Sequence, residues 1–460
     1  MLIVQIDGLS ADHLDRAINQ GLMPNLHQRL KQGALELSEY RCGLPSQTSV
    51  VVGGFLYGEM LPGNQYYDKA AGQIRDGSSL TKAHEVDGEL AARNQGLLEH
   101  GSVYVSPLSG GAPSEKAYFT LSDMAAHQAK GDGLKETARE ALHLGKFLLA
   151  HPAHAAQTAV HISRRIWSEW RLRDQTHRPL GTIVKDAVKE AFASDAAVHA
   201  MAAEMKRGEP VMYVDLAHFD GLSHPHGPGP IAFDSLKYVD RDLKVLFEGM
   251  DRAERPYQMA LLADHGQVFA YHFDDLYGQS IQELTEKLSG QTVLSLDFGS
   301  GANLYFTALP GLLERDQLPA GVVASLKQHQ GVALVVTRAG QATLIEGKEG
   351  SVKVDAEGVK IQGEDPLARF GPTELLARQL HRQAHRPNGG DIIVYGENYR
   401  DGQIDFSTGD FRGLHGGIGL GQDRPFLAFT PGMNLDPASL EGADDLYRQL
   451  KTHLPADARK

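Results

Sequence analysis

The sequence predicts an α/β fold in which a mixed, mostly parallel sheet is sandwiched by helices, with a helical insertion. Two observations support this prediction. Short apolar runs typical of buried strands alternate with helical patterns along most of the 460 residues. Between about 70 and 205, long helical patterns dominate instead. We therefore expect a core of residues 1–70 and 208–460, with a small β-rich segment at about 331–365, and a helical insertion or cap at 71–207.

The core begins with a predicted strand at Met1–Ile6 and a helix at Met23–Leu30, with Pro24 in its first turn. Further strands are predicted at 211–214, 258–263, 292–296, 303–306, 332–336, 391–395 and 426–429. Further helices are predicted at about 231–248, 319–328, 373–384 and 443–453, and a β meander at about 341–363. The insertion is expected to contain helices at about 135–150, 154–173 and 183–206, with a possible hairpin near 103–104 and 117–121.

Composition and charge exclude several classes of protein. The net charge of −13 argues against a general binder of nucleic-acid duplexes, whose surface would be basic. A single cysteine, Cys42, excludes an intrachain disulfide and a cysteine-rich metal site. No stretch reaches the ~18 apolar residues of a membrane span, and residues 1–6 are too short for a signal-peptide core. We therefore expect a cytoplasmic protein with a small-molecule partner, while its oligomeric state stays open.

Residues 43–64 (GLPSQTSVVVGGFLYGEMLPGN) combine a proline turn, two hydroxyl side chains and an apolar run. This order is typical of a loop that enters a helix, with Ser46 or Thr48 near the helix start. Free backbone N–H groups and the helix dipole favour an anion such as phosphate there. A hydroxyl at this place is a weak nucleophile unless a base or a metal lowers its pKa. Chemistry at this loop therefore requires ligands from elsewhere, and without them the loop is an ordinary helix cap.

Carboxylate and imidazole side chains occur together in four separated segments. They are Asp7, Asp220 with His224, Asp264 with His265, and His415. Aspartate and histidine suit zinc or manganese, and no cysteine competes with them. The first and third segments follow predicted strands, and ligands of such sheets bind beyond the carboxyl ends of the strands. The second segment lies in a Gly- and Pro-rich stretch, FDGLSHPHGPG, and is expected to bind an ion as a clip within a loop. Together the segments predict a divalent-metal site, although each alone also fits a structural role.

These motifs resemble the nucleotide pyrophosphatase/phosphodiesterase (type I phosphodiesterase) branch of the alkaline phosphatase superfamily. That branch has a strand-end aspartate, a Pro-x-x-Thr segment and a Gly-Asn-x-x-Tyr-Asp stretch, matched here by Asp7, 45–48 and 63–68. It also has Asp-x-x-x-His-x-x-Gly-Pro, Asp-His-Gly and a late His-Gly, matched here by 220–228, 264–266 and 415–416. The motifs agree in order and rough spacing from residue 1 to about 430, but they do not cover the insertion or the C-terminal end.

The resemblance implies an alkaline-phosphatase-like fold and a site for two divalent metal ions, zinc or manganese. One ion would be held by Asp220, His224 and His415. The other would be held by Asp7, Asp264 and His265, with the Thr48 oxygen as an additional ligand. Such a pair stabilises the Thr48 alkoxide and clamps the attacking and departing oxygens. A covalent phosphothreonine would form, and water activated at the first ion would hydrolyse it. Asn64 and the backbone N–H of Thr48 would donate to a phosphoryl oxygen.

Several neighbouring residues compete for these roles. The spacing to the family's nucleophile selects Thr48 over Ser46. The two histidines beside the 220–224 pair, His218 and His226, do not match the family pattern, so an orienting or solvated role is expected. Asp215, at a strand end, is set aside because the family aspartate aligns with residue 220.

The sequence also departs from the family around the nucleophile. Thr48 is followed by SVVVGGF, where family members carry an aromatic-Pro-Asn-His run that helps to shape the nucleotide-base pocket. Arg41 is the arginine nearest in sequence, and Lys69 is another source of positive charge. Monoesters carry two negative charges and tend to need an arginine or a third cation. The sequence therefore favours phosphodiester or nucleotide pyrophosphate bonds, with a phosphomonoesterase as the alternative.

One segment of the insertion, residues 162–173 (ISRRIWSEWRLR), holds both tryptophans among four arginines. A basic aromatic helix can lie on an anionic membrane or contact a partner. The simpler interpretation is a helix that packs Ile162, Ile166 and Trp170 on the core and leaves its arginines in solvent. The same segment is also a candidate roof for the active site.

Three other functions remain as alternatives. Sulfatases share the superfamily architecture, but Cys42 and Pro45 have the wrong spacing for Cys/Ser-x-Pro-x-Arg, and one calcium does not call for three histidines. Cofactor-independent phosphoglycerate mutases use a serine nucleophile with manganese, whereas Thr48 and the motif at Asn64 favour a hydrolase. A metal-stabilised binding module would not explain a nucleophile-type loop accompanied by seven candidate ligands.

Overall fold

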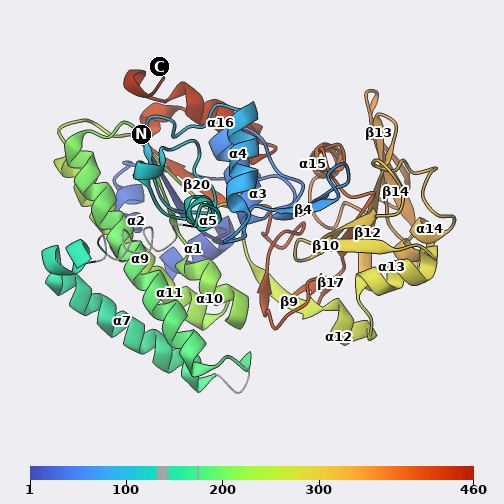
Figure 1. The fold of residues 1–460 in the computed structure, drawn as a ribbon, viewed down its shortest axis with the longest axis horizontal. Coiled ribbons are helices and arrows are strands. Elements are labelled where there is room, and N and C mark those ends of the chain that lie inside the picture. The colour runs from blue at the N-terminus through green and yellow to red at the C-terminus, as the bar shows by residue number, and fades with distance from the viewer. Residues whose placement is uncertain (132–141, 143–144, 173–175, 460) are drawn as a thin grey trace.

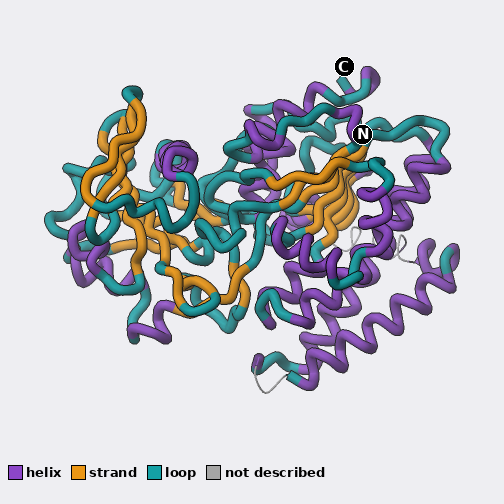
Figure 2. Tube along the Cα trace, turned by 180° about the vertical axis from the view of Figure 1, so that it is seen from behind, coloured by secondary structure: helices purple, strands orange, loops and turns teal. Residues whose placement is uncertain are grey.

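A computed structural model describes residues 1–460 except 132–141, 143–144, 173–175 and 460 (Figure 1). Two groups of strands are seen side by side in Figure 2, one surrounded by long helices and one formed mainly by residues after 290. The first group is the central sheet, and the chain segments that join the two groups lie at the candidate site described below.

The central sheet has seven strands in the order β2-β20-β8-β1-β7-β5-β6. Their bounds are β1 (Leu2–Ile6), β2 (Glu36–Glu39), β5 (Ser102–Ser106), β6 (Ala117–Thr120), β7 (Met212–Leu216), β8 (Met259–Leu262) and β20 (Phe426–Phe429). The strands β8, β1, β7, β5 and β6 are parallel, whereas β20 and β2 at one edge are antiparallel. All residues of β1, β7 and β8 are buried, as expected for parallel strands covered on both faces.

Helices cover both faces of this sheet because its side chains alternate in direction. In β1, Ile3 packs in one apolar cluster with α3 (Thr48–Tyr57) and α16 (Ala443–Thr452). Leu2 and Val4 pack on the other face with α9 (Leu180–Arg207), α11 (Pro230–Arg252), α1 (Ala11–Asn19) and α2 (Pro24–Lys31). The mixed, mostly parallel sheet sandwiched by helices that the sequence predicts is confirmed.

A second sheet is antiparallel throughout, in the order β10-β11-β16-β12-β13-β14-β15. Its strands are β10 (Val293–Asp297), β11 (Gly301–Phe306), β12 (Val332–Ala339), β13 (Ala342–Glu346), β14 (Gly350–Asp355), β15 (Gly358–Gly363) and β16 (Ile392–Gly396). The helices of this part are α12 (Phe273–Tyr277), α13 (Ile281–Ser289), α14 (Val322–Gln328) and α15 (Thr373–Ala384). Strands β12 to β15 form the meander expected at about 341–363, which begins one strand earlier than expected.

Two small sheets border the candidate site. One has the order β17-β18-β9-β19, with β9 (Val268–His272), β17 (Asn398–Tyr399), β18 (Gly402–Asp405) and β19 (Gly413–Leu414). The other pairs β3 (Gln65–Asp68) with β4 (Gln73–Asp76). Strand β9 follows residues 264–266 in the chain, and β19 immediately precedes His415. The first of these sheets therefore ties two predicted ligand segments together.

Residues 71–207 contain α4 (Ala83–Arg93), α5 (Leu121–Ala129), α7 (Pro152–Arg171) and α9, together with β5 and β6. The expected hairpin of 103–104 and 117–121 is wrong, because β5 and β6 are parallel and extend the central sheet. The helix expected at 135–150 lies partly outside the described residues. The division into a core of 1–70 and 208–460 and an insertion of 71–207 stays a prediction, and two strands of that insertion belong to the central sheet.

Within the part of the chain that the structure describes, no helix is both long and apolar enough to cross a membrane. The cytoplasmic location stays a prediction.

Helix α3 depends on a close approach to α16, which gives a test of the fold. A Cβ atom at Gly54 would lie 2.7 Å from the Cβ of Ala443 and 2.8 Å from the Cγ of Met60. Gly54→Ala should therefore push α3 away from α16 and lower the free energy of unfolding by about 1–3 kcal/mol. The matched control is Gly88→Ala in α4, where a Cβ meets nothing within 4 Å. That change should raise the stability by up to about 1 kcal/mol, because alanine favours a helix. Urea denaturation measures both, and equal effects of the two substitutions would contradict the packing argument.

Candidate metal centre

The seven predicted ligands gather at the carboxyl ends of the parallel strands. Asp7 directly follows β1, and Asp264 and His265 follow β8. Helix α10 (His218–His226) follows β7 and carries Asp220 and His224, whereas Thr48 begins α3 and His415 follows β19. The carboxyl ends of adjacent parallel strands meet at one edge of a sheet, so segments far apart in the chain converge there.

One group of candidate ligands consists of Asp220, His224 and His415, whose ligand atoms lie within 4.8 Å of one another. The loop expected around the first two is wrong, because residues 218–226 form a helix. Two residues four apart lie on the same face of a helix, and His224 Nε2 is 3.2 Å from Asp220 Oδ2. Pro225 is tolerated because the helix ends just after it, at Gly227, which has a φ of 72°.

The second group surrounds His265. Its Nε2 atom lies 3.4 Å from Asp7 Oδ1, 3.2 Å from Asp264 Oδ2 and 3.1 Å from Thr48 Oγ1. The ligand atoms of Asp7, Asp220 and His265 also lie within 4.8 Å of one another. Asp220, expected in the first group alone, therefore lies between the two groups.

The three histidines are oriented in the same way. In each, Nδ1 lies at hydrogen-bond distance from a backbone carbonyl: His224 from Gly413 O at 3.1 Å, His265 from Gly266 O at 3.2 Å and His415 from Ser46 O at 3.0 Å. A carbonyl only accepts, so Nδ1 carries the proton and donates. In the neutral form of each ring the lone pair is therefore on Nε2, the nitrogen that is available to a metal ion.

Four carboxylates lie close together, those of Asp7, Asp215, Asp220 and Asp264. Their mutual repulsion raises the free energy of each ionised carboxylate. Burial, followed by the charges of Asp264, Asp220 and Asp215, raises the pKa of Asp7 well above its usual value. Burial and Asp220 raise the pKa of Asp264 to about 6. Asp7 Oδ1 and Asp264 Oδ2 are also buried without a hydrogen-bond partner. Unpaired carboxylate oxygens beside unprotonated imidazole nitrogens are the donor set that a hard-to-borderline divalent cation requires, so the residues fit such an ion.

Two residues that the sequence did not single out position Asp220. The side-chain amide of Gln267 donates to Asp220 Oδ1. Gly8 has a φ of +74°, and a Cβ atom there would lie 2.9 Å from Asp220 Oδ1. Any other residue at position 8 would be strained and would displace this carboxylate. Gly8 was visible in the sequence only as the glycine after Asp7, and Gln267 had no sequence signal.

The two hydroxyls of the 43–64 segment face different surroundings. Ser46 is buried, and its Oγ donates to the carbonyl of Gly417 at 3.2 Å. Thr48 lies at the first position of α3 and reaches His265. The predicted cap is wrong in one respect, since Gln47 occupies the cap position and makes no side-chain hydrogen bond to the helix.

Asn64 is held beside Thr48 with a defined orientation. The side-chain Oδ1 of Asn64 accepts a hydrogen bond from the backbone N–H of Ser49 at 3.0 Å. The backbone N–H of Asn64 donates to Gln47 Oε1 at 2.8 Å. Because Oδ1 is engaged by a donor, the Nδ2 group is the donor end that remains for a ligand. Asn64 and Thr48 line the same cavity, of about 770 Å³.

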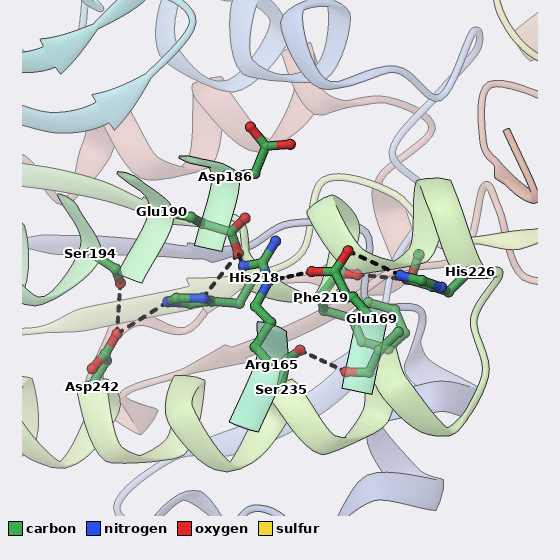
Figure 3. A network of polar contacts seen from close by, with 12 residues as sticks. Arg165, Glu169, Asp186, Glu190, Ser194, His218, Phe219, His226, Ser235 and Asp242 are labelled. Carbon is green, nitrogen blue, oxygen red and sulfur yellow. Dashed lines mark hydrogen bonds and ion pairs between the residues drawn. The ribbon is translucent and has the colours of Figure 1, made fainter. Parts of the chain in front are cut away.

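The positive charge near this cavity comes from an unexpected place. Arg41 pairs with Asp423 at 2.5 Å, and Lys69 pairs with Asp391 at 2.6 Å. The cavity is instead lined by Arg165 and Lys189 of the insertion. The prediction that the arginines of 162–173 are solvated is wrong for Arg165, which is buried. Its side chain points from α7 toward α10 rather than to solvent (Figure 3).

His218 and His226, which were not predicted to be ligands, contact carboxylates of the insertion (Figure 3). His218 Nδ1 is 3.0 Å from Glu190 Oε1, and His226 Nε2 is 3.2 Å from Glu169 Oε2. Burial opposes the charge on His218, but Asp242 and Glu190 together raise its pKa to about 9. Its Nδ1 faces Glu190 and its Nε2 lies 3.7 Å from Asp242 Oδ2, and among the described residues His218 belongs to no group of candidate metal ligands.

The fold recurs among solved structures. Phosphonoacetate hydrolase from Sinorhizobium meliloti 1021, in complex with phosphonoformate, is 16% identical over 98% of this chain and 94% of that chain, with a TM-score of 0.53. Murine ectonucleotide pyrophosphatase/phosphodiesterase 5, in an inactive variant in complex with AMP, is 13% identical over 99% of this chain and 94% of that chain, with a TM-score of 0.53. The chain has an alkaline-phosphatase-like fold.

This alkaline-phosphatase-like fold is what the sequence motifs predict, so the resemblance is confirmed at the level of the fold. No protein-family model matches the sequence, and no curated protein is significantly similar to it. The ligand and nucleophile roles of individual residues stay predictions.

The raised pKa of Asp264 gives a pH dependence with a defined sign. Below about pH 6 this carboxyl holds a proton in the metal-free protein, and a bound ion must displace it. The affinity for zinc should therefore fall on acidification, by about tenfold per pH unit for each proton released. The metal-free protein should itself lose stability as the pH rises from about 4 to about 6, because the folded state gives up a proton that the unfolded state loses at lower pH.

Calorimetric titration with zinc in two buffers of different ionisation enthalpy measures the protons released. We expect more protons at about pH 5.5 than at about pH 7.5. An equal number at both pH values would contradict the carboxylate arrangement.

Proposed function

We propose that this protein is a two-metal hydrolase of phosphate esters that cleaves phosphodiester or nucleotide pyrophosphate bonds through a covalent phosphothreonine. The observation that carries the proposal is the common orientation of His224, His265 and His415. Each has its Nδ1 directed at a backbone carbonyl, so that Nε2 faces carboxylates beside the Thr48 hydroxyl. A site that served only to stabilise the fold would not need a hydroxyl at a helix start within this group.

Two sets of residues would hold two divalent ions, zinc or manganese. The first set is Asp220, His224 and His415, and the second is Asp7, Asp264, His265 and the Thr48 oxygen. Such a pair lowers the pKa of a hydroxyl and neutralises charge on the oxygens that attack and depart. The ligand atoms of Asp220 lie close to those of both sets, so this carboxylate would be available to either ion.

The chain's own groups then carry the reaction. The Thr48 hydroxyl gives its proton to solvent, and its oxygen attacks phosphorus in line with the leaving group. The bond to the leaving oxygen breaks, and that oxygen keeps the electron pair and takes a proton from solvent. A water molecule next attacks the phosphothreonine, breaks the bond between Thr48 Oγ1 and phosphorus, and restores the hydroxyl. Asn64 Nδ2 and the Thr48 backbone N–H donate to a phosphoryl oxygen throughout.

The local charge supports a diester or an anhydride rather than a monoester. The sequence argument rested on a shortage of cations, and Arg165 now lines the cavity. Its guanidinium is already paired with Glu169 at 2.9 Å and Glu190 at 3.0 Å, so it adds little net charge. Lys189 is the other cation of the lining, which also includes the carboxylates of Asp7 and Asp215. A diester carries one negative charge fewer than a monoester, and its binding needs less compensation. The phosphonoformate and AMP complexes of the similar structures agree with a phosphorus-containing substrate.

Replacing the nucleophile tests this proposal. Thr48→Ala should reduce turnover of bis(4-nitrophenyl) phosphate by about 10³-fold or more, while the zinc content stays the same. Ser46→Ala is the matched control, because this hydroxyl donates to Gly417 and should be dispensable for turnover. Mass spectrometry of the acid-quenched wild type should detect phosphate on the peptide that contains Thr48. Full activity of Thr48→Ala would overturn the nucleophile assignment, and a protein that binds zinc but hydrolyses no ester would favour a binding module.

A further inference from the structure

The cavity that contains the candidate metal centre has a second, apolar wall. Alongside Thr48, His224 and His415, its lining includes apolar side chains from the 71–207 region. They are Val105, Phe119, Leu121, Met124, Val188 and Phe192. Whatever occupies this cavity of about 770 Å³ therefore contacts both the proposed reaction centre and an apolar surface.

Part of this wall is built by strained backbone. Val105 has a φ of 50° and Phe119 has a φ of 56°, in a region that side chains with a Cβ rarely adopt. The two residues occupy equivalent places on neighbouring parallel strands, since Val103 pairs with Ala117 and Ser106 with Thr120. A β-branched residue in this conformation costs of order 1–3 kcal/mol, and such residues cluster at ligand sites. The backbone conformation of Val105 and Phe119 differs from that of a regular strand, and both side chains line the cavity.

Four of the six residues of the apolar wall lie outside the apolar core clusters, whereas Val105 and Phe192 pack against them. Phe119, Leu121, Met124 and Val188 are only partly buried or exposed, and none belongs to the apolar core clusters of the described residues. Partly exposed apolar side chains that face one enclosed space mark a binding site for an apolar group.

Several polar side chains of the same cavity are already engaged within the protein. The hydroxyls of Ser49, Ser78, Ser106 and Ser194 each donate to a protein oxygen. Arg165 pairs with Glu190, and Asp186 pairs with Arg178, whereas the Lys189 ammonium also lines the cavity. A nucleobase placed against the apolar side chains would leave most of its donors and acceptors unpaired, which costs free energy. The apolar side of the cavity therefore favours a group without hydrogen-bonding atoms.

We propose that the ester group bound by this wall is apolar, an alkyl chain or an unsubstituted aryl ring, so that the preferred substrate is an apolar phosphodiester. The inference rests on the proposed phosphate-ester hydrolysis and names its substrate class. Each methylene group that enters the wall should raise kcat/KM by about fourfold, the factor expected for removing one methylene from water. The phosphoryl group of the same substrate lies at Thr48, and the apolar ester group extends toward Met124 and Val188.

A series of 4-nitrophenyl phosphodiesters tests this preference in the zinc-loaded protein. The second ester group is methyl, butyl, hexyl, phenyl or thymidine. We expect kcat/KM to rise from methyl to hexyl and to be lower for thymidine than for phenyl. Equal values for methyl and hexyl esters, with turnover present, would overturn the apolar subsite and leave the hydrolase proposal intact.

Binding without turnover separates the two proposals. Calorimetry should show hexylphosphonate binding more tightly than methylphosphonate, even if no ester is hydrolysed. Tighter binding without any turnover would support the subsite and contradict the hydrolase. Equal binding of the two phosphonates would overturn the subsite.

Matched substitutions on α9, together with one on α5, locate the effect. Val188→Thr exchanges a methyl group for a hydroxyl at nearly constant volume, and Met124→Gln makes a similar change of polarity. Each should lower the ratio of hexyl to methyl kcat/KM by about threefold or more. The control is Val184→Thr, one turn earlier on α9, where the side chain is 37% exposed against 39% for Val188 but does not line the cavity. The control should leave the ratio unchanged, and an equal effect at both valines would contradict the assignment.

A different observation carries a second inference, about how helix α10 is held. Arg165 forms ion pairs with two carboxylates that contact the two ends of this helix. Its Nε is 2.9 Å from Glu169 Oε1, and its Nη1 is 3.0 Å from Glu190 Oε1. Those carboxylates contact His226 and His218, which flank the candidate ligands of α10 (Figure 3). The side chain of Glu169 is fully buried, and that of Arg165 is 3% exposed.

The ion network adds to an apolar attachment of α10. Phe219 and Leu222 of α10 lie in the apolar cluster that contains α11, whereas α7 packs with α9 through a small cluster of Ile162, Ala187 and Ala191. The buried ion network links α10 to α7 and α9. Burying charges is costly unless every partner is present, so loss of one carboxylate leaves its partners uncompensated and weakens this link.

We infer that Glu169, Arg165 and Glu190 are positioning residues, which hold α10 so that Asp220 and His224 bind their ion. Glu169→Gln should weaken zinc binding by about tenfold, as seen when groups that orient metal ligands are replaced. The matched control is Glu204→Gln on α9, whose exposed partner Arg207 lies three residues away.

Competition with a chromophoric chelator measures the zinc affinity, and urea denaturation measures the stability. A lower stability with unchanged zinc affinity would overturn the inference, because it would reveal a purely structural role. Hydrogen exchange on the wild type provides a check that needs no variant. Zinc should slow exchange in α7, which contacts no candidate ligand of the first set, and unchanged exchange there would contradict the link.

Discussion

The site depends on the compensation of buried negative charge. Asp7, Asp215, Asp220 and Asp264 converge at the ends of parallel strands, where burial and mutual repulsion raise the pKa of three of them. Asp220 is the exception: burial alone would raise its pKa, but His224, His415 and His265 hold it below its usual range. The network at α10 follows the same rule, because each buried carboxylate there meets an arginine or a histidine.

The loops that supply this compensation fix one another. The carbonyl of Ser46, two residues before Thr48, accepts a hydrogen bond from His415 Nδ1, and Ser46 also forms an isolated β-bridge with Gly416. The nucleophile segment and the last ligand segment therefore cannot move independently. The rings of His265 and His415 stack with their centroids 3.6 Å apart, so a residue of one proposed ligand set contacts a residue of the other.

The sequence predicted most of the core because its signals are local. The strand at 426–429 and the helix at 373–384 agree with the structure residue for residue, since apolar period and flanking residues define them. The loop expected at 218–226 was wrong because Gly and Pro were read as a loop, whereas Pro225 lies in the last turn of α10. The pairing of β5 with β6 agrees with the expected hairpin, but its parallel direction does not, because strand direction is set by the sheet and a short apolar run does not encode it.

The sequence by itself determined which residues are candidates for the chemistry: Asp and His at strand ends, and a threonine at a helix start, are fixed by residue type and order. Tertiary structure alone decided how they are used. It placed Asp220 between the two groups and aligned three imidazoles on backbone carbonyls. It also turned Arg165 from an expected solvent position into the cavity wall. The physical reason is that charge compensation and cavity shape depend on contacts between segments hundreds of residues apart, which no local pattern encodes.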